Sequence, residues 1–509
     1  MTRLRSFAAL LALLVVTSGC GLTGLVSPAS PGPSVASSPT ITGPATMPPR
    51  ATATPRPAVT TAPATPRPAA TAGPTATPAP PPTSAPGTPG PTPTPRPPLA
   101  IRILAAGARA AAGAPDADVA RLVKGSTDFA LDLLARVIRS SGDANVALGP
   151  SSISAAFGLL HAGARGQTAT QIEQVMGFDL PAARLNAAAN TLDQALQSRQ
   201  NKKVELDIVN QLFGQDGYPF SQAYLRTAAR QFGAPLATVD FERKAAAVTK
   251  LINTWIADHT NGHITDVIPP DTLDASTRLV LANATYLKAE WAQKFEKVFT
   301  SPRPFTRLDG TAVKVPMMSQ SAHFPAAFTP DYTAVELPYV GDKLAMLIVM
   351  PRKPDAFLAG LDADGLAAIV DGLKTSFRVR GYTFDYVDLK MPRWSTRTNV
   401  GLRPLLAKMG MTDVWQPGVA DLTGIADPTV TGEAPLSASA ATHEAWIKVT
   451  EKGTEAAAVT VIDLGTGGGI DIPPPSVNLD HPFLWFIRDR ETGAILFAGR
   501  VTDPSVTAD

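Results

Sequence analysis

Apolar residues recur three and four positions apart in several stretches of the chain, the pattern of a helix that buries one face. The stretch from Asp118 to about Arg139 repeats in this way at Phe129, Leu133, Leu134, Val137 and Ile138. The same spacing predicts helices over Ser151–Gly163, just after Pro150, and over Ala245–His259, which Thr260-Asn261-Gly262 ends.

Short runs of apolar and β-branched residues follow these helices and predict strands at residues 279–281, 344–350 and 385–390. Helices and strands are interspersed without the regular alternation of a doubly wound fold, and no internal repeat is visible. The sequence therefore predicts an α+β domain with large sheets.

The first twenty residues have a different pattern. A basic tip precedes an apolar run from Phe7 to Val16, and small residues follow up to Cys20, the only cysteine. This is the pattern of a secretory signal, and the apolar run is too short to span a bilayer comfortably. Ser18-Gly19-Cys20 resembles a bacterial lipoprotein cleavage site, where the cysteine becomes the lipidated N-terminus, although Thr17 stands where an aliphatic residue is commoner. The alternative is simple secretion.

Residues 21–115 predict a disordered linker. The stretch to about residue 100 consists almost wholly of Pro, Ala, Thr, Ser and Gly, which cannot bury a core. In a polyproline II conformation, roughly 75 residues at about 3.1 Å each would reach on the order of 200 Å, so this segment would act as a stalk. Residues 1–115 carry eight arginines and no acidic residue, which leaves the rest mildly acidic, with 37 basic and 43 acidic residues. Nothing in that balance indicates a nucleic-acid surface.

The motifs of common enzymes are missing. The chain contains no Gly-x-Ser-x-Gly, no His-Glu-x-x-His and no Cys-x-x-Cys, and its six histidines are scattered. The glycine cluster at residues 465–469 is followed by prolines rather than by Lys-Ser/Thr and a helix, so it does not fit a phosphate loop. We therefore predict a protein that is not an enzyme and that uses no cofactor or metal.

The most informative stretch runs from Glu451 to Ile462. Read with period two, one face of this segment would consist of Thr454, Ala456, Ala458 and Thr460, all small and uncharged. A glycine-rich segment, residues 464–470, follows and predicts an exposed, cleavable loop. The residues alone leave two interpretations open: a strand built to be added late to a sheet, or a plain strand that leads into a flexible turn.

Glu451–Ala458 resembles the hinge of the reactive-centre loop in inhibitory serpins. Further blocks resemble the same family in the same order, from about residue 118 to 505; these are residues 145–154, 162–168, 281–291, 480–489 and 493–501. The resemblance implies the serpin fold over residues 116–509, with about three β-sheets, eight to nine helices and an exposed loop. It identifies the chain as a serpin of bacterial lipoprotein type.

The resemblance also implies a mechanism, that of a suicide inhibitor. A serine or cysteine endopeptidase would attack the loop and be trapped as an acyl-enzyme while the cleaved loop inserts into the central sheet. The implied hinge consists of Glu451, Gly453, Thr454, Glu455, Ala456, Ala457 and Ala458. The alternative is a non-inhibitory serpin that acts as a surface binding or structural protein. In either case we expect a monomer.

The scissile bond is less well defined. Counting from Glu451 in the family's manner gives Gly467-Gly468, and counting back from His481-Pro482 gives a bond near Ile470-Asp471. Leu464 and Ile470 would suit elastase-like or subtilisin-like proteases. No Arg or Lys lies between Lys452 and Arg488, which disfavours trypsin-like targets.

Four further positions match family sites in the region where the central strands part. Ser152, Asn283 and His443 match a polar cluster, the shutter, although Gly149 stands where the family usually has a serine. Trp291 matches a tryptophan at the top of the sheet, the breach. The alternatives are that His443 is a hydrogen-bonded core histidine and Trp291 an ordinary core aromatic residue.

Overall fold

The computed structural model describes residues 10–18, 102–104, 107–260, 262, 265–454 and 472–507. Within these residues there are ten α-helices and four sheets, so the α+β architecture is confirmed. The helices are α1 (Asp116–Ser141), α2 (Pro150–His161), α3 (Gly166–Met176), α4 (Ala182–Gln197), α5 (Gln222–Phe232), α6 (Phe241–His259), α7 (Pro354–Ala359), α8 (Ala363–Asp371), α9 (Arg403–Met409) and α10 (Pro428–Thr431).

The largest sheet has eight strands and is called here the central sheet. Along its main path the order is β1 (Leu10–Ser18), β16 (Leu436–Thr450), β17 (Gly453–Thr454), β6 (Thr277–Glu290), β4 (Val204–Gln215), β5 (Leu236–Val239) and β2 (Arg102–Leu104). The eighth strand, β15 (Trp394–Gly401), pairs with the other edge of β16, and β1 pairs with β6 as well as with β16.

A second sheet has six strands, in the order β3 (Val146–Leu148), β20 (Ile495–Val501), β19 (Phe483–Asp489), β11 (Leu344–Pro351), β10 (Tyr332–Pro338) and β9 (Ala326–Phe328). A four-stranded sheet contains β18 (Ser476–Asn478), β14 (Val387–Pro392), β8 (Ala312–Ala322) and β7 (Ser301–Thr306). The fourth is the hairpin of β12 (Phe377–Val379) and β13 (Tyr382–Phe384). This hairpin and short helices such as α10 account for the excess over the expected three sheets and eight to nine helices.

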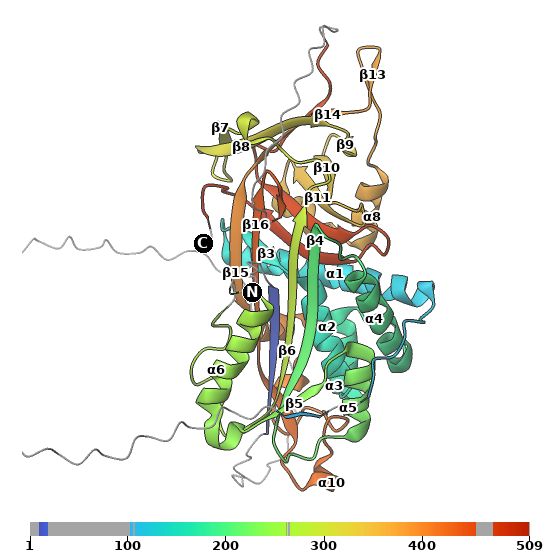
Figure 1. Ribbon diagram of the computed structural model, residues 1–509, viewed down its shortest axis with the longest axis vertical. Coiled ribbons are helices and arrows are strands. Elements are labelled where there is room, and N and C mark those ends of the chain that lie inside the picture. The colour runs from blue at the N-terminus through green and yellow to red at the C-terminus, as the bar shows by residue number, and fades with distance from the viewer. Residues whose placement is uncertain are drawn as a thin grey trace, which may run out of the picture. The chain divides into compact units, whose positions relative to one another are not determined.

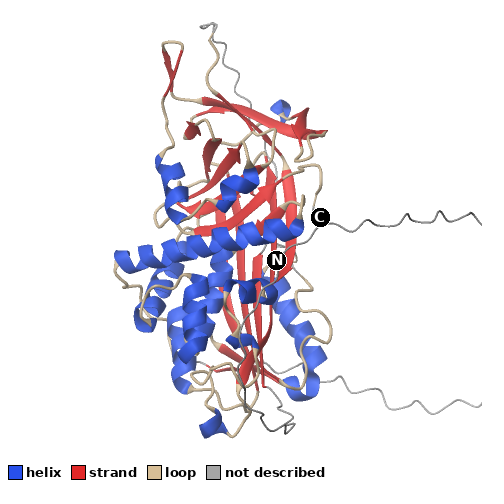
Figure 2. Ribbon diagram, turned by 180° about the vertical axis from the view of Figure 1, so that it is seen from behind, coloured by secondary structure: helices blue, strands red, loops and turns tan. Residues whose placement is uncertain are grey.

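The apolar patterns decide where the helices pack. On β6, Leu279 and Leu281 belong to the core cluster that α1, α2 and α4 share, whereas Val280 and Ala282 belong to a cluster with α6. Figure 1 shows α6 in front of the central sheet, and Figure 2, from behind, shows the other helices covering its opposite face. Because both faces of β6 are covered, its residues 279–282 form a continuous apolar run instead of an alternating one.

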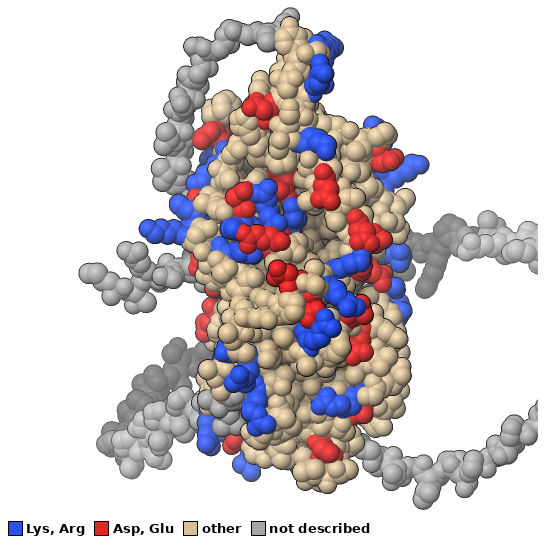
Figure 3. Space-filling model, turned by 90° about the vertical axis from the view of Figure 1, so that its right-hand side faces the viewer, with Lys and Arg blue, Asp and Glu red and all other residues tan. Residues whose placement is uncertain are grey.

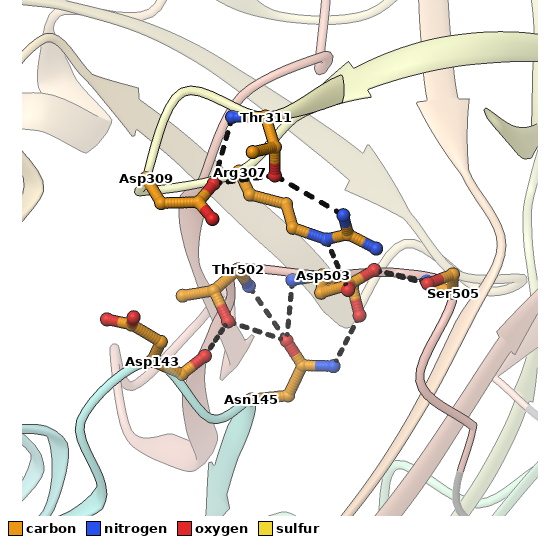
Figure 4. Close-up of polar contacts among 8 residues, drawn as sticks. All are labelled: Asp143, Asn145, Arg307, Asp309, Thr311, Thr502, Asp503 and Ser505. Carbon is orange, nitrogen blue, oxygen red and sulfur yellow. Dashed lines mark hydrogen bonds and ion pairs between the residues drawn. The ribbon is translucent and has the colours of Figure 1, made fainter. Parts of the chain in front are cut away.

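A polar cluster fastens the end of β20 to the start of β3 (Figure 4). The Asn145 side chain accepts hydrogen bonds from the backbone N–H groups of Thr502, at 2.8 Å, and Asp503, at 3.0 Å, and donates one to the Asp503 carbonyl at 2.7 Å. Arg307, after β7, donates to the Asp503 carboxylate at 2.6 Å. These contacts tie the chain that follows β20 to the segment that precedes β3, at the edge of the six-stranded sheet.

Contacts with the domain begin before residue 116. The strand β2 pairs with β5, Arg109 forms an ion pair with Asp193, and the Gly113 N–H donates to the Thr191 hydroxyl at 3.0 Å. The last part of the predicted linker therefore packs against the folded region, because its backbone and Arg109 find partners there.

The apolar run near the N-terminus also lies in the central sheet. Leu10–Ser18, inside the predicted signal segment, forms β1, which is antiparallel to both β6 and β16 (Figure 1). None of the helices among the described residues has the length and apolar character needed to cross a membrane. On the face shown in Figure 3, basic and acidic side chains are interspersed.

Candidate functional site

The site is the seam between β6 and β16 in the central sheet. These two strands are connected through β17 and β1, two shorter strands that lie between them and pair with both. At one end of the seam β17 pairs with both, Thr454 lying opposite Val449 of β16 and Ala289 of β6. Lower down, β1 pairs with both from Leu10 onward, opposite Ala445 and Thr285. The seam is therefore a place where strands from two distant parts of the chain enter one sheet.

The start of the predicted hinge already lies in this seam. Gly453 approaches β6 so closely that a Cβ atom there would stand 2.0 Å from the Ala289 carbonyl oxygen, which only glycine permits. The Thr454 hydroxyl lies 2.6 Å from the Tyr339 hydroxyl, and both residues are buried. Glu455, Ala456, Ala457 and Ala458, and all the candidate scissile residues from Leu464 to Ile470, lie outside the described residues.

Trp291 lies next to the start of the predicted hinge. Its ring stacks on Tyr339 with 4.6 Å between centroids and 10° between planes, and its indole N–H donates to the Thr450 carbonyl at 3.0 Å. Its backbone N–H donates to the Lys452 carbonyl at 2.8 Å. Trp291 therefore holds the chain on both sides of Glu451, where the predicted hinge begins. Tyr339 was missed in the sequence, because nothing local to it indicates a contact with residue 454.

Glu451, the first residue of the predicted hinge, is anchored through its side chain. Its carboxylate is buried, accepts a hydrogen bond from the Thr300 hydroxyl at 3.0 Å and lies 3.8 Å from the Arg393 guanidinium. The next residue, Lys452, is 8 % exposed, and its ammonium has no hydrogen-bond partner among the described residues. Desolvation and the nearby Lys297 and Lys294 lower the pKa of Lys452.

The residues matched to the shutter lie farther down the seam. His443 is fully buried, and its Nε2 accepts a hydrogen bond from the Gly149 N–H at 3.0 Å. Ser152 is buried on α2, one turn after Gly149, whose carbonyl accepts from the Ser152 N–H at 3.1 Å. By register, Asn283 of β6 and His443 of β16 both lie opposite Ala12 of β1. Gly149 contributes its backbone N–H to the cluster, so the absence of a serine hydroxyl there does not leave His443 Nε2 without a donor.

This arrangement is a receptor for a strand. Its polar groups hold backbone segments in place, and no cluster of three or more metal-ligating side chains occurs within the described residues. Backbone pairing along two edges needs an extended segment with small side chains, and the residues that follow Thr454 in the sequence have that character.

Comparison with known proteins agrees with this geometry. The model of the family described as Serpin (serine protease inhibitor) matches residues 124–504. A leukocyte elastase inhibitor of Xenopus tropicalis is 33% identical over 384 residues, 74% of this chain and 98% of the relative. An uncharacterized serpin-like protein of the archaeon Methanosarcina acetivorans is 31% identical over 388 residues, 74% of this chain and 86% of the relative.

Among solved structures, human thyroxine-binding globulin complexed with its hormone superposes with a TM-score of 0.66 at 27% identity, covering 77% of this chain and all of that one. The family match covers well over half of the chain and includes the hinge, both strands that border the seam and the whole six-stranded sheet. The chain belongs to the serpin family.

Proposed function

We propose that this protein is a suicide inhibitor of a serine or cysteine endopeptidase, and not an enzyme. The observation that carries the proposal is that β17 already pairs with both β6 and β16, so the hinge is positioned at the mouth of the seam. A loop that begins between these two strands is positioned to extend between them, along the part of the seam that β1 occupies in this structure.

Insertion is the step that would trap the protease. Nucleophilic attack on a loop carbonyl forms an acyl-enzyme and releases the new amino terminus on the C-terminal side. The hinge can then add ladder hydrogen bonds along both strands and carry the attached protease with it. Thr454, Ala456, Ala458 and Thr460, which would share one face, are uncharged, and none is proline, so nothing in that face opposes rapid insertion.

The proposed target is an elastase-like or subtilisin-like protease. Leu464 and Ile470 offer apolar side chains near the expected bond, and the loop has no basic residue for a trypsin-like pocket. Several relatives at 31–33% identity are named leukocyte elastase inhibitors, which supports this class.

For location, we propose an exported bacterial protein held at the cell surface by a lipid on Cys20, with the proline-rich segment as a stalk. The support is the basic tip, the apolar run and the Ser18-Gly19-Cys20 sequence. Mass spectrometry of the N-terminal peptide from membranes tests this, because a lipidated Cys20 at the first position is expected, and an unmodified Cys20 would contradict it.

The test of function is to mix the purified chain with elastase-, subtilisin- and trypsin-like proteases and to separate the products on denaturing gels. We expect a complex that survives denaturant with an elastase- or subtilisin-like enzyme, and the C-terminal peptide identified by mass spectrometry would locate the scissile bond. A complex formed best with trypsin would contradict the assignment of the target.

A pair of hinge variants tests the insertion step. Ala456→Arg places a charge on the face that would enter the sheet, and we expect the variant to be cleaved without forming the complex. Glu455→Arg, the control, places the same side chain on the opposite face, where by the same count it would lie beside Lys288 and the exposed Lys448, and it should retain most of the complex. If Ala456→Arg traps the protease as well as the parent chain does, loop insertion is not the mechanism. Clean cleavage of the processed chain, which begins at Cys20, by every protease would favour the non-inhibitory alternative.

A further inference from the structure

The lower part of the seam is occupied by the chain's own N-terminal strand. Leu10–Ser18 pairs with Ala445 to Leu436 on β16, and Leu10–Thr17 pairs with Thr285 to Thr277 on β6. The strand is therefore hydrogen-bonded along both edges for most of its length, which is the position of a central strand and not of an edge strand.

This strand runs where the loop would have to go. Both β1 and β17 are antiparallel to β6 and to β16, so they point in the same direction along the seam. Counting on residue by residue from Thr454, Ala458 would lie opposite Thr285 and Ala445, the two residues with which Leu10 pairs. Continuing in the same way, Thr460 would take the place of Ala12, between Asn283 and His443.

Two segments cannot use the same backbone donors and acceptors, and neighbouring strands are only about 4.8 Å apart. The sequence of residues 10–18, Leu-Leu-Ala-Leu-Leu-Val-Val-Thr-Ser, contains neither a charge nor a proline, so nothing in it opposes a buried central position. The strands on both sides also present buried apolar residues here, among them Leu281, Leu436 and Ala441.

We propose that residues 10–18 are a built-in occupant of the seam and that, while they remain attached, they prevent insertion of the reactive loop. This rests on the proposed function. It adds that the unprocessed chain is a substrate of the protease and not a trap for it. If the signal is cleaved before Cys20, as the sequence predicts, the same cleavage removes the whole strand and arms the inhibitor. Export and activation would then be a single event.

The test uses the full chain, residues 1–509, produced without signal processing, and a variant with Leu13→Pro. Proline in the middle of a central strand removes a ladder donor and is incompatible with the pairing, so β1 should leave the seam. The matched control is Ala8→Pro, which introduces proline before the first residue of β1. The readouts are the ratio of covalent complex to cleaved product and the hydrogen exchange of β6 and β16.

If residues 10–18 fill the seam in about nine molecules out of ten, only about one in ten can insert its loop, and the ratio of complex to cleaved product falls about tenfold. We therefore expect Leu13→Pro to raise this ratio at least about tenfold over the parent chain, and Ala8→Pro to leave it unchanged. Exchange at residues 279–285 and 436–445 should become faster only in Leu13→Pro. An N-acetylated peptide with the sequence of residues 10–18, added to Leu13→Pro, should restore slow exchange and lower the ratio again.

The proposal would be overturned if the parent chain and Leu13→Pro gave equal ratios of complex to cleaved product and equal hydrogen exchange. It would also be overturned if exchange became faster in Leu13→Pro but the amount of complex did not rise, although other forms of the chain trap the same protease. If no form of the chain traps any protease, the proposed inhibitory function fails. The exchange difference and the peptide effect would still decide separately whether residues 10–18 occupy the seam.

Discussion

The six-stranded sheet and the central sheet are both held by backbone hydrogen bonds between strands, but their long strands are connected differently. In the six-stranded sheet every residue of β19 and β20 is buried, and the two strands pair with each other in nearly unbroken register. In the central sheet β6 and β16 are joined through a two-residue piece from one end of the chain and a nine-residue piece from the other. Two long, buried strands that pair directly leave no place for exchange, whereas strands that are joined through inserted pieces can exchange those pieces.

The largest expected difference between the two sheets is the loss of stability when alanine replaces one of two equally crowded glycines. A Cβ atom on Gly499 would lie 2.1 Å from the Val146 carbonyl oxygen, and one on Gly453 would lie 2.0 Å from that of Ala289. We expect Gly499→Ala to destabilise the protein by at least about 3 kcal/mol, because β20 has nowhere to move. Gly453→Ala should cost at most about 1 kcal/mol, because β17 can leave the seam.

Thermal unfolding of both alanine variants measures this difference. Hydrogen exchange of β17 in Gly453→Ala should also become faster, and formation of the protease complex should change with it. Equal losses of stability in the two variants would mean that the seam is as fixed as the six-stranded sheet.

The next effect concerns two buried glutamates. Glu336 of β10 lies 2.8 Å from Arg488 and 3.1 Å from Arg490, and the first arginine is nearly buried. Glu336→Gln should cost about 2 kcal/mol, since it leaves buried positive charge without its counter-charge. Glu451→Gln in the hinge should cost less than about 1 kcal/mol, because an amide oxygen can still accept from Thr300 and Arg393 is partly exposed.

Chemical denaturation midpoints of the two glutamine variants at pH 7 test this order. A greater loss for Glu451→Gln would show that the hinge anchor is a main source of stability and would remove the contrast between the two sheets.

The smallest expected effect is a gain of stability with rising pH at Lys452. Burial lowers the pKa of this ammonium, so the unfolded chain holds the proton over a pH range in which the folded chain releases it. Stability should therefore rise with pH between the lowered pKa and about 10.5, the ordinary value for lysine. Lys452→Met should raise the unfolding temperature at pH 7 and abolish that part of the rise.

Unfolding temperatures from pH 7 to 10.5 would measure this, with Lys448→Met as the control, since Lys448 is exposed on the neighbouring strand. If the two methionine variants show the same pH dependence as the parent chain, the Lys452 ammonium does not oppose folding.

Local periodicity was sufficient to predict much of the fold. The helices predicted at residues 118–139, 151–163 and 245–259 correspond to α1, α2 and α6, and the three predicted strands lie in β6, β11 and β14. Leu279 to Ala282 show why this works, because their burial on alternate sides of β6 is set by spacing within one element.

Contacts between distant elements could not be predicted in the same way. Tyr339 meets Thr454 across the sheet, and Gly149 serves His443 through a backbone group that any residue except proline would offer. The entry of residues 10–18 into the seam depends on a gap between two strands more than 260 residues farther along the chain. An apolar run has the same composition whether it enters a membrane or a sheet.

The polar cluster around Asn145 has a consequence for what a cut loop would leave behind. All the described chain after the loop, including β18, β19 and β20, is paired within the four- and six-stranded sheets, and Asn145 and Arg307 hold its end at residues 502–503. A protein cut in the loop should therefore remain one particle of unchanged mass under native conditions, and its two pieces should separate only in denaturant. Cleavage would go unnoticed in any assay that keeps the protein folded.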